Sequence, residues 1–326
     1  MAYVGPSFND YTNAETNMTT SSGLTPGMQT YYNRTLLLDK EAKLVHRQFC
    51  THVPFPKKSG STMNLRKLLK VDSNTTPLTE GNPGAGQMLS ETYVTMNIAQ
   101  YGDYVRTTDW LDLVHLDERI ESRVRRMGDA GMRSLDEVCR DEMASVTSVI
   151  YANGRAARNA ITASDKLTNV ELRKAVVQLK NNLAEPFEGG MYVAIINPNI
   201  TYDLQDDSRF LAVSEYQDKE NIYKGEIGRL QGLYGVRLVE ATNIKIFEGA
   251  GSGSADVASI IVLGRDAFYD TDLEGANPHV IVKNPGSAGT LDPLDQLSTV
   301  GWKINGYGVK AVQPQYCVRI ECGFTA

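Results

Sequence analysis

The sequence predicts an α+β protein in which a long helix and several buried strands follow two extended, polar segments. From Asp117 onward, apolar residues recur at helical steps, whereas "MYVAIINP" and "ASIIVLG" are the short apolar runs typical of buried strands. Residues 1–35 and 53–87, by contrast, are rich in polar residues, proline or glycine and show little periodicity. Neither segment can bury enough apolar surface alone to offset the entropy lost on ordering.

Composition excludes several classes of protein. With 326 residues, 41% hydrophobic and 22% charged, the chain has enough apolar material for one large domain or two intertwined ones. The formal net charge of -6 argues against a general nucleic-acid binder and against docking on an anionic membrane. No signal peptide is expected, and the longest apolar runs are far shorter than the roughly 20 residues that span a bilayer. The cysteines, at 50, 139, 317 and 322, show no Cys-x-x-Cys spacing, which predicts reduced thiols in a cytoplasmic compartment.

The polar segment at residues 53–87 leads into "ETYVTMNIAQYGDYVRTTDW". There Val94, Met96 and Ile98 alternate with Thr95, Asn97 and Ala99, which is the pattern of a half-buried strand. A long stretch with little regular structure is unusual inside a compact domain. We therefore predict a long protruding hairpin whose return strand is this alternating stretch.

A long helix is predicted from about residue 117 to about residue 153. Its apolar face consists of residues at steps of three and four or their sums: Ile120, Val124, Met127, Gly131, Leu135, Val138, Val146 and Val149. On the other face, acids precede arginines at i,i+4: Glu121 and Arg125, Asp129 and Arg133, Asp136 and Arg140. Each such pair stabilises a helix by about 0.2–0.5 kcal/mol. We therefore expect these arginines to be neutralised within the helix instead of binding phosphate.

The stretch "KGEIGRLQGLYGVRLVEA" (residues 224–241) has the closely spaced glycines that phosphate loops also have. A phosphate loop requires a strand, then glycines, then a helix. Here the glycines follow a polar region and lead into an apolar strand, so two tight turns around a short helix fit better. We predict Gly225 and Gly235 at turns, at least one of them with positive φ, and residues 236–239 in a strand.

No sequence motif indicates catalysis or metal binding. G-x-S-x-G is absent, the histidines at 46, 52, 115 and 279 lack H-E-x-x-H spacing, and "YDLQDDSRF" lacks the glycine and final glutamate of a calcium loop. We therefore predict no enzymatic activity, no cofactor and no metal. A site assembled from dispersed residues remains the alternative.

The order of N-terminal arm, long loop, long helix, α/β middle and C-terminal strands resembles the major capsid (coat) protein of tailed bacteriophages, with the HK-ninety-seven-like fold. More narrowly, the sequence resembles the N-four-type branch of phage coat proteins. The matching stretches, scattered across residues 53–244, are "VPFPKKSGSTMNLRKLLKV", "PLTEGNPG", "YGDYVRTTDWLDL", "MYVAIINPNITYDLQDDSRFL" and "IYKGEIGRLQGLYGVRLVEATNI". The last of these is the most specific, because a run of that length rarely matches by chance.

The resemblance implies a role for each region. Residues 1–47 would be the N-terminal arm, 48–109 the extended E-loop hairpin and return strand on a neighbouring subunit, 110–167 the peripheral domain with its spine helix, 168–289 the axial α/β domain, and 290–326 the C-terminal strands of the peripheral domain. The candidates for intersubunit contacts are Lys57, Lys58, Leu65, Arg66, Lys67, Leu68 and Lys70. The candidate hinges or turns are Gly128, Gly131, Gly225 and Gly235.

The function implied is structural: pentamers and hexamers of the chain tile an icosahedral shell around packaged double-stranded DNA, without sequence-specific contact. The implied partners are the chain itself, a separate scaffolding protein, a portal protein and, where the shell is decorated, a decoration or cement protein. The implied location is the virion capsid, assembled in the host bacterial cytoplasm without a membrane. No motif supports the covalent cross-link of the family's type member. Two alternatives remain: an encapsulin-like compartment that houses a cargo enzyme, and a soluble α+β enzyme.

Overall fold

The computed structural model describes residues 44–75, 77, 80–81, 86–114, 120–187, 189–205, 235–274, 279–287 and 292–325. The chain forms two compact units. Unit 1 contains Met1–Glu41, Gln100–Ser134 and Ala276–Asn305, and unit 2 contains Ala42–Ala99, Leu135–Gly275 and Gly306–Ala326. Most of the predicted N-terminal arm and the predicted turn at Gly225 lie outside the described residues.

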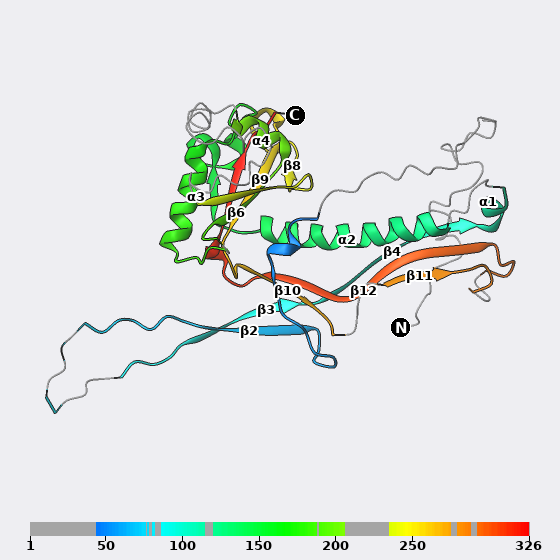
Figure 1. Ribbon diagram of the computed structural model, residues 1–326, viewed down its shortest axis with the longest axis horizontal. Helices are drawn as coiled ribbons and strands as arrows, with labels where there is room; N and C mark the ends of the chain where they lie inside the picture. The colour runs from blue at the N-terminus through cyan, green and yellow to red at the C-terminus, as the bar shows by residue number, and fades with distance from the viewer. Residues whose placement is uncertain are drawn as a thin grey trace, which may run out of the picture. The chain divides into compact units, whose positions relative to one another are not determined.

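Apart from short 3-10 helices, the described elements begin with strands, continue with α-helices and strands in turn, and end with strands (Figure 1). The α-helices are α1 (Asp109–Val114), α2 (Ile120–Ala144), α3 (Asn169–Asn181) and α4 (Pro198–Gln205). The strands are β1 (Thr51–His52), β2 (Thr62–Leu68), β3 (Glu91–Asn97), β4 (Ala99–Thr108), β5 (Val149–Tyr151), β6 (Tyr192–Ile196), β7 (Val236–Glu240), β8 (Ile246–Phe247), β9 (Val257–Leu263), β10 (Phe268–Asp272), β11 (His279–Lys283), β12 (Leu297–Ala311) and β13 (Cys317–Cys322). Among the described helices, none is long and apolar enough to cross a membrane.

The core of unit 2 is a six-stranded mixed sheet in the order β5-β13-β9-β6-β7, with β8 paired to β9. Strands β6, β9 and β13 are buried along their whole length. Because both faces of these strands are covered, their sequences are continuous apolar runs instead of alternating ones. The predicted buried strands "MYVAIINP" and "ASIIVLG" are confirmed as β6 and β9. Helix α3 packs against β5, β9 and β13.

Helix α3 begins where the sequence places a capping box. The Thr168 side chain accepts a hydrogen bond from Val170 N, and the Glu171 carboxylate accepts one from Thr168 N at 3.1 Å. Each contact satisfies a backbone N–H group that the first turn of a helix leaves unpaired. At the edge of the same sheet, Gly235 has φ +69° and β7 starts at the next residue. The prediction of a positive φ followed by a strand is therefore confirmed.

The first part of β12 and two other strands form the sheet of unit 1. Strand β11 pairs antiparallel with β12, from His279↔Lys303 to Lys283↔Thr299, and β4 also pairs with β12. The first part of α2 packs on one face of this sheet, where Gly131 lies against the indole of Trp302. The last part of β12 belongs to unit 2, where it pairs antiparallel with β10.

Helix α2 is shorter than predicted, because it ends at Ala144 and not near residue 153. Residues 149–151, which the helical periodicity included, form strand β5 and pair in parallel with β13. Their sequence, Val-Ile-Tyr, consists of β-branched and aromatic residues, which favour a strand. The expected pair of Asp136 with Arg140 is also absent from the described contacts, since the Asp136 carboxylate binds His46 instead.

The two C-terminal strands were predicted together as peripheral strands, and they pair in different sheets. Strand β12 pairs with β4, β10 and β11, whereas β13 pairs with β5 and β9 in the six-stranded sheet. A short 3-10 helix at Pro314–Tyr316 connects them. Cys317 and Cys322 point to opposite faces of β13, as their odd spacing requires, and both are fully buried because each face is covered.

Candidate assembly surfaces

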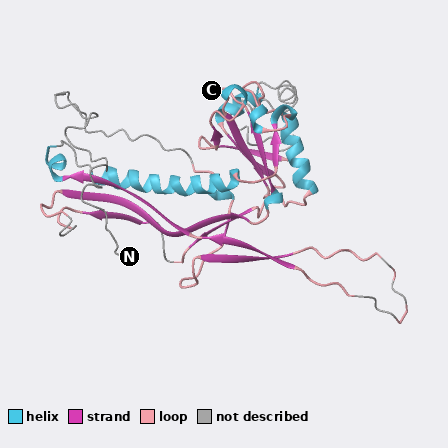
Figure 2. Cartoon of the chain, turned by 180° about the vertical axis from the view of Figure 1, so that it is seen from behind, coloured by secondary structure: helices cyan, strands magenta, loops and turns pink. Residues whose placement is uncertain are grey.

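The hairpin of unit 2 is the feature that the sequence singled out for contacts between subunits. Strands β2 and β3 pair antiparallel from Thr62↔Asn97 to Leu68↔Glu91, and residues 69–90 connect them (Figure 2). The predicted hairpin is confirmed, but its return strand ends at Asn97, and the rest of the predicted return stretch forms β4, which pairs with β12. An isolated two-stranded hairpin is only marginally stable in water, so its outer part needs further contacts.

The two faces of the hairpin differ in chemistry. One face carries the cross-strand pairs Met63↔Met96, Leu65↔Val94 and Lys67↔Thr92. On the other face, Arg66 donates two hydrogen bonds to Glu91, at 3.1 and 2.6 Å, and Thr95 donates one to Asn64 at 2.9 Å. Arg66 is thus already paired within the hairpin.

The base of the hairpin is fixed to unit 2 by close packing. Met96 is 0% exposed. At the next residue, the Asn97 carbonyl oxygen lies so close to Gly308 of β12 that a Cβ there would come within 2.5 Å of it. Only glycine tolerates this approach. The hairpin is therefore held at its base, and it becomes more exposed along its length.

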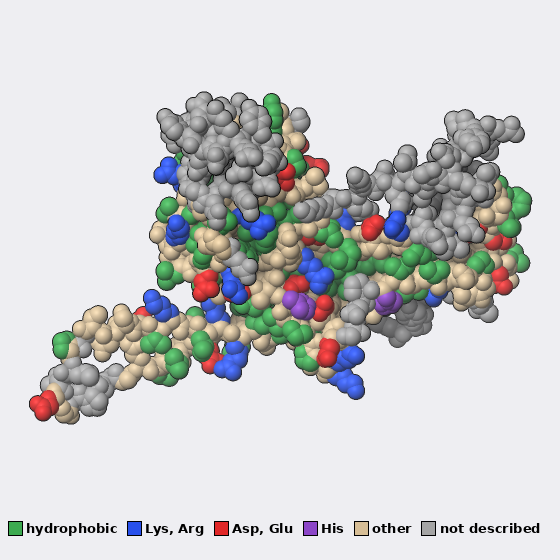
Figure 3. All heavy atoms as spheres, in the orientation of Figure 1, with side chains coloured by type: hydrophobic (Ala, Val, Ile, Leu, Met, Phe, Trp, Pro, Cys, Tyr) green, Lys and Arg blue, Asp and Glu red, His purple; other side chains and the backbone are tan. Residues whose placement is uncertain are grey.

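The outer part of the hairpin exposes large apolar side chains. These are Leu68, Leu69, Val71, Met88, Leu89 and Tyr93. Met88 is 90% exposed. Figure 3 shows apolar and basic side chains exposed along this part of the chain. Exposed apolar side chains grouped in this way mark an interaction surface, because a soluble monomer rarely carries them without a function.

The remaining basic candidates are four lysines of the hairpin segment. Lys57 and Lys58 lie in a tight turn in which Lys58 has φ +65°. Lys67 is half-buried and Lys70 is exposed. None of these four lysines forms an ion pair with another residue that the structure describes. They are therefore available for an acidic partner, whereas Arg66 is not.

The chain that leads into the hairpin is anchored at a buried polar cluster. Asp136 of α2 accepts hydrogen bonds from His46 N at 2.8 Å and Arg47 N at 3.2 Å, and its second oxygen lies 2.8 Å from His46 Nδ1. Burial opposes ionisation of Asp136, but the hydrogen bonds from His46 and Arg47 outweigh it and lower the pKa of the carboxyl group. Arg47 also donates to Asp270 of β10 at 3.1 Å. The entry to the hairpin is thus tied to both α2 and β10.

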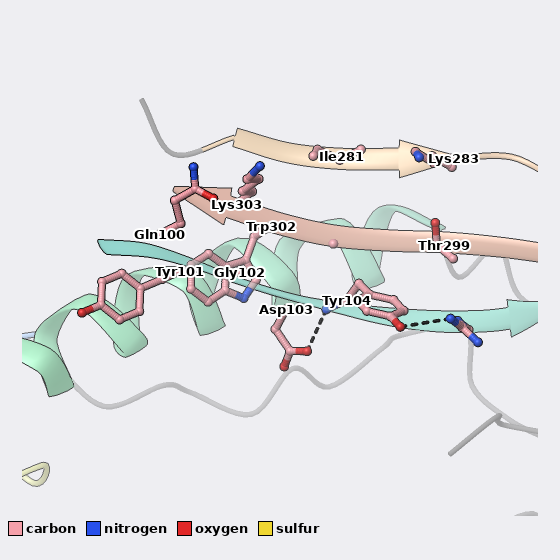
Figure 4. A pocket seen from close by; sticks show the side chains of 12 residues that line it. Gln100, Tyr101, Gly102, Asp103, Tyr104, Ile281, Lys283, Thr299, Trp302 and Lys303 are labelled. Atoms are coloured by element: carbon pink, nitrogen blue, oxygen red, sulfur yellow. Dashed lines mark hydrogen bonds between the residues drawn. The ribbon is translucent and has the colours of Figure 1, made fainter. Parts of the chain in front are cut away.

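Unit 1 contains a basin of about 490 Å³ on its sheet (Figure 4). Gly102 and Gly301 are among its lining residues and let β4 and β12 approach closely, since a Cβ at Gly102 would meet Trp302 O at 2.9 Å and a Cβ at Gly301 would meet Tyr104 Cβ at 2.8 Å. Side chains from all three strands line it, among them Tyr104, Ile281, Lys283 and Lys303. In Figure 4 the side chains of Lys303 and Asp103 point to opposite sides of β4. The basin is therefore basic and partly aromatic.

Within the described part of the chain, no group of three or more His, Cys, Asp or Glu residues could hold a metal ion. The two candidate hinge glycines of α2 differ in their surroundings. Gly131 packs on Trp302, whereas a Cβ at Gly128 would have only Val280 Cγ2 nearby, at 4.0 Å. The basin was not predicted from the sequence, because it depends on which strands β12 pairs with.

Comparisons with known proteins give the fold a context. No protein-family model matches the sequence, and no curated protein matches it. Solved structures do match. A chain from the capsid of Ralstonia phage GP4 aligns with a TM-score of 0.70 at 14% identity, covering 95% of this chain and 98% of that one.

Two more phage structures are similar to this chain to about the same degree. The capsid structure of the cyanophage P-SCSP1u gives a TM-score of 0.70 at 13% identity, covering 91% of this chain and 94% of that one. The head structure of Helicobacter pylori bacteriophage KHP40 gives a TM-score of 0.69 at 13% identity, covering 98% of this chain and 99% of that one. The chain has the fold of a phage capsid protein. The alignments cover nearly the whole of each chain.

Proposed function

We propose that the chain is the major capsid protein of a tailed bacteriophage. Copies of it would form pentamers and hexamers that tile an icosahedral shell around packaged double-stranded DNA. The observation that carries this proposal is the capsid fold, which chains from phage capsids share over 91% to 98% of this chain in the three comparisons given above. The narrower N-four-type branch rests on the sequence stretches that suggested it.

The exposed hairpin supports assembly on physical grounds. Its apolar outer part is costly in water, and covering it on a neighbouring copy would remove that cost. Each contact between copies is modest, but closed symmetry repeats every contact many times. A standard interface of about 1,600 Å² is within reach of an extended segment of this length. We therefore assign the hairpin the role of an E-loop that lies on a neighbouring subunit.

The other regions take roles that agree with this arrangement. Helix α2 would be the spine of the peripheral domain, and the six-stranded sheet with α3 and α4 would form the axial domain around the five-fold and six-fold axes. The separate scaffolding protein, the portal protein and any cement protein would be partners during or after assembly. The net charge of -6 suits a container that must not bind its DNA tightly.

Negative-stain microscopy of the full chain, expressed alone and together with a candidate scaffolding protein, tests the proposal. We expect capsomers or closed shells, with regular shells in the co-expressed sample. A stable monomer or dimer at every protein concentration in size-exclusion chromatography would refute the proposal. Shells that consistently contain a cargo enzyme and no DNA would refute the genome-container function and favour a compartment.

A further inference from the structure

One end of unit 1 carries a second exposed apolar surface, distinct from the hairpin. Trp110, Leu113 and Val114 of α1 project into solvent, and Leu294 is exposed in the segment before β12. Trp110 is 62% exposed and Leu113 is 78% exposed. We call these four residues the tip patch. An exposed tryptophan beside exposed aliphatic residues is the composition of an interface anchor.

The tip patch is rigidly held, which an anchor requires. Leu111 of α1 is buried. Arg123 of α2 donates hydrogen bonds to Asp112 at 2.5 Å and to Thr107 at 2.6 Å. Asp109 N donates to Gln296 O at 2.8 Å, which ties α1 to the segment that carries Leu294. The patch is therefore ordered before any partner binds, so its docking costs little conformational entropy.

The surroundings of the tip patch are acidic. The two segments that carry it, residues 109–114 and 292–296, contain Asp109, Asp112, Asp292 and Asp295 and no lysine or arginine. Asp292 is buried and accepts a hydrogen bond from Leu297 N, so the other three form the acidic rim. Arg123 neutralises one of these charges. An apolar anchor with an acidic rim calls for an apolar hollow with a basic rim.

The basin has those properties. Ile281, Lys283, Gly301 and Lys303 lie at alternating positions of β11 and β12 and so share one face of the sheet. The opposite face is occupied, since Trp302 points to α2 and contacts Gly131. The basin, which Tyr104 and Ile281 also line, has a volume of about 490 Å³. An indole ring fits in such a hollow, and the two lysines would face the aspartates.

We propose that the tip patch of one copy docks in the basin of a second copy, with Trp110 in the hollow and Asp109 and Asp295 beside Lys283 and Lys303. The inference rests on the proposed assembly and adds a contact to it. Within one chain the contact is out of reach, because β4 runs straight from Gly102 to α1 over roughly 20 Å. Since the patch and the basin are different surfaces, each copy uses both, and the contact propagates into a ring or lattice instead of stopping at a dimer.

Charge argues against the hairpin as the occupant of the basin. The hairpin segment brings the cations Lys57, Lys58, Arg66, Lys67 and Lys70 against the acids Asp72, Glu80 and Glu91. Its excess of positive charge would be repelled by Lys283 and Lys303. The acidic tip patch is attracted by the same two lysines.

Site-specific photo-cross-linking tests the contact in assembled particles of the full chain. A benzophenone amino acid replaces Trp110, and particles are built from a mixture of isotope-labelled and unlabelled copies, so that cross-links between copies are recognised by mass. We expect the cross-linked peptide of the second copy to include residues 281–283 or 299–303. Cross-links to the hairpin, cross-links to another α1, or no cross-link between copies would each overturn the proposal.

Substitutions give an independent readout. Trp110→Ser and Lys283→Glu should each reduce the yield of particles at least tenfold without changing the thermal unfolding of the unassembled chain. The double variant should be no worse than either single one, because both substitutions remove the same contact. Tyr202→Ser, an exposed aromatic on α4, is the matched control and should assemble normally. Normal yields with Trp110→Ser would overturn the contact. If the wild-type chain forms no particles at all, the proposed function fails instead.

Discussion

Gly131 of α2 lies directly against the indole of Trp302: a Cβ at this position would come within 2.9 Å of Trp302 Cδ2. The sequence marked Gly131 as a hinge, and the contact gives it a packing role. Gly131→Ala should lower the free energy of unfolding by about 1–3 kcal/mol, since the ring and helix must move apart. Thermal unfolding followed by circular dichroism measures the loss. Gly131→Leu should go further and prevent normal assembly and maturation.

Gly128 provides the matched control for that substitution. An added Cβ there would find only Val280 Cγ2, at 4.0 Å, which is an ordinary contact. Gly128→Ala should therefore stabilise the helix by up to about 1 kcal/mol. If Gly131→Ala were as stable as Gly128→Ala, the packing explanation would be wrong.

Two methionines of the hairpin should separate folding from assembly. Met96 is 0% exposed, so Met96→Ala should cost about 2–5 kcal/mol of unfolding free energy by leaving a cavity. Met88 is 90% exposed, so Met88→Ala should leave stability within about 0.5 kcal/mol. It should nevertheless reduce the yield of particles, because the side chain would be buried on a neighbour. Urea unfolding and light scattering measure the two effects, and normal assembly of Met88→Ala would count against an apolar contact at the outer hairpin.

The basic residues of the hairpin should divide into two groups: Arg66 stabilises the hairpin itself, whereas Lys70 acts in assembly. Exchanging the charges of one ion pair, by Arg66→Glu together with Glu91→Arg, should restore the stability that either single change lowers by up to about 1 kcal/mol. Lys70→Glu should leave stability unchanged and weaken assembly, more strongly at low salt than at high salt. Sedimentation at two ionic strengths provides the measurement. An assembly defect in the charge-exchanged double variant equal to that of Lys70→Glu would contradict the division.

Local patterns in the sequence predicted those parts of the fold that depend on local physics. The hairpin, the buried strands β6 and β9 and the positive φ of Gly235 follow from alternation, apolar runs and turn chemistry. The end of α2 did not follow from the local pattern. Residues 149–151 form a strand, but their sequence also fits the helical period. Their pairing with β13, more than 160 positions later in the chain, decides between the two.

Of the candidate surfaces, the sequence predicted the hairpin and missed the other two. The hairpin was identified from composition, because a polar segment with isolated leucines has no place in a monomer core. The basin and the tip patch were missed, since they depend on the pairing of β4 and β11 with β12. The contact of Arg158 with the buried Glu321 was also missed, because Arg158 lies more than 160 positions earlier in the chain.

Asp165 should make the stability of unit 2 sensitive to acid. It is 2% exposed and accepts hydrogen bonds from Arg155 at 2.9 Å, from Asn153 at 2.9 Å and from Thr162 N at 2.8 Å. Burial opposes its ionisation, but these donors outweigh burial and hold the pKa of the carboxyl group well below its ordinary value. A lowered folded pKa contributes stability above the unfolded pKa of about 3.9, and this stability is lost as the pH falls below that value.

Asp165→Asn should therefore lower the free energy of unfolding at pH 7 by roughly 3 kcal/mol, since it leaves Arg155 without its buried partner. The variant should also lose less stability than the wild type between pH 4 and pH 2, because the titrating group is gone. Urea titrations across this range measure both effects. Asp72→Asn, at an exposed position of the hairpin loop, is the control. It should change neither the stability at pH 7 nor the loss of stability between pH 4 and pH 2. An acid-induced loss as steep in Asp165→Asn as in the wild type would assign the sensitivity to other carboxylates, of which Asp136 and Asp203 also have lowered pKa values.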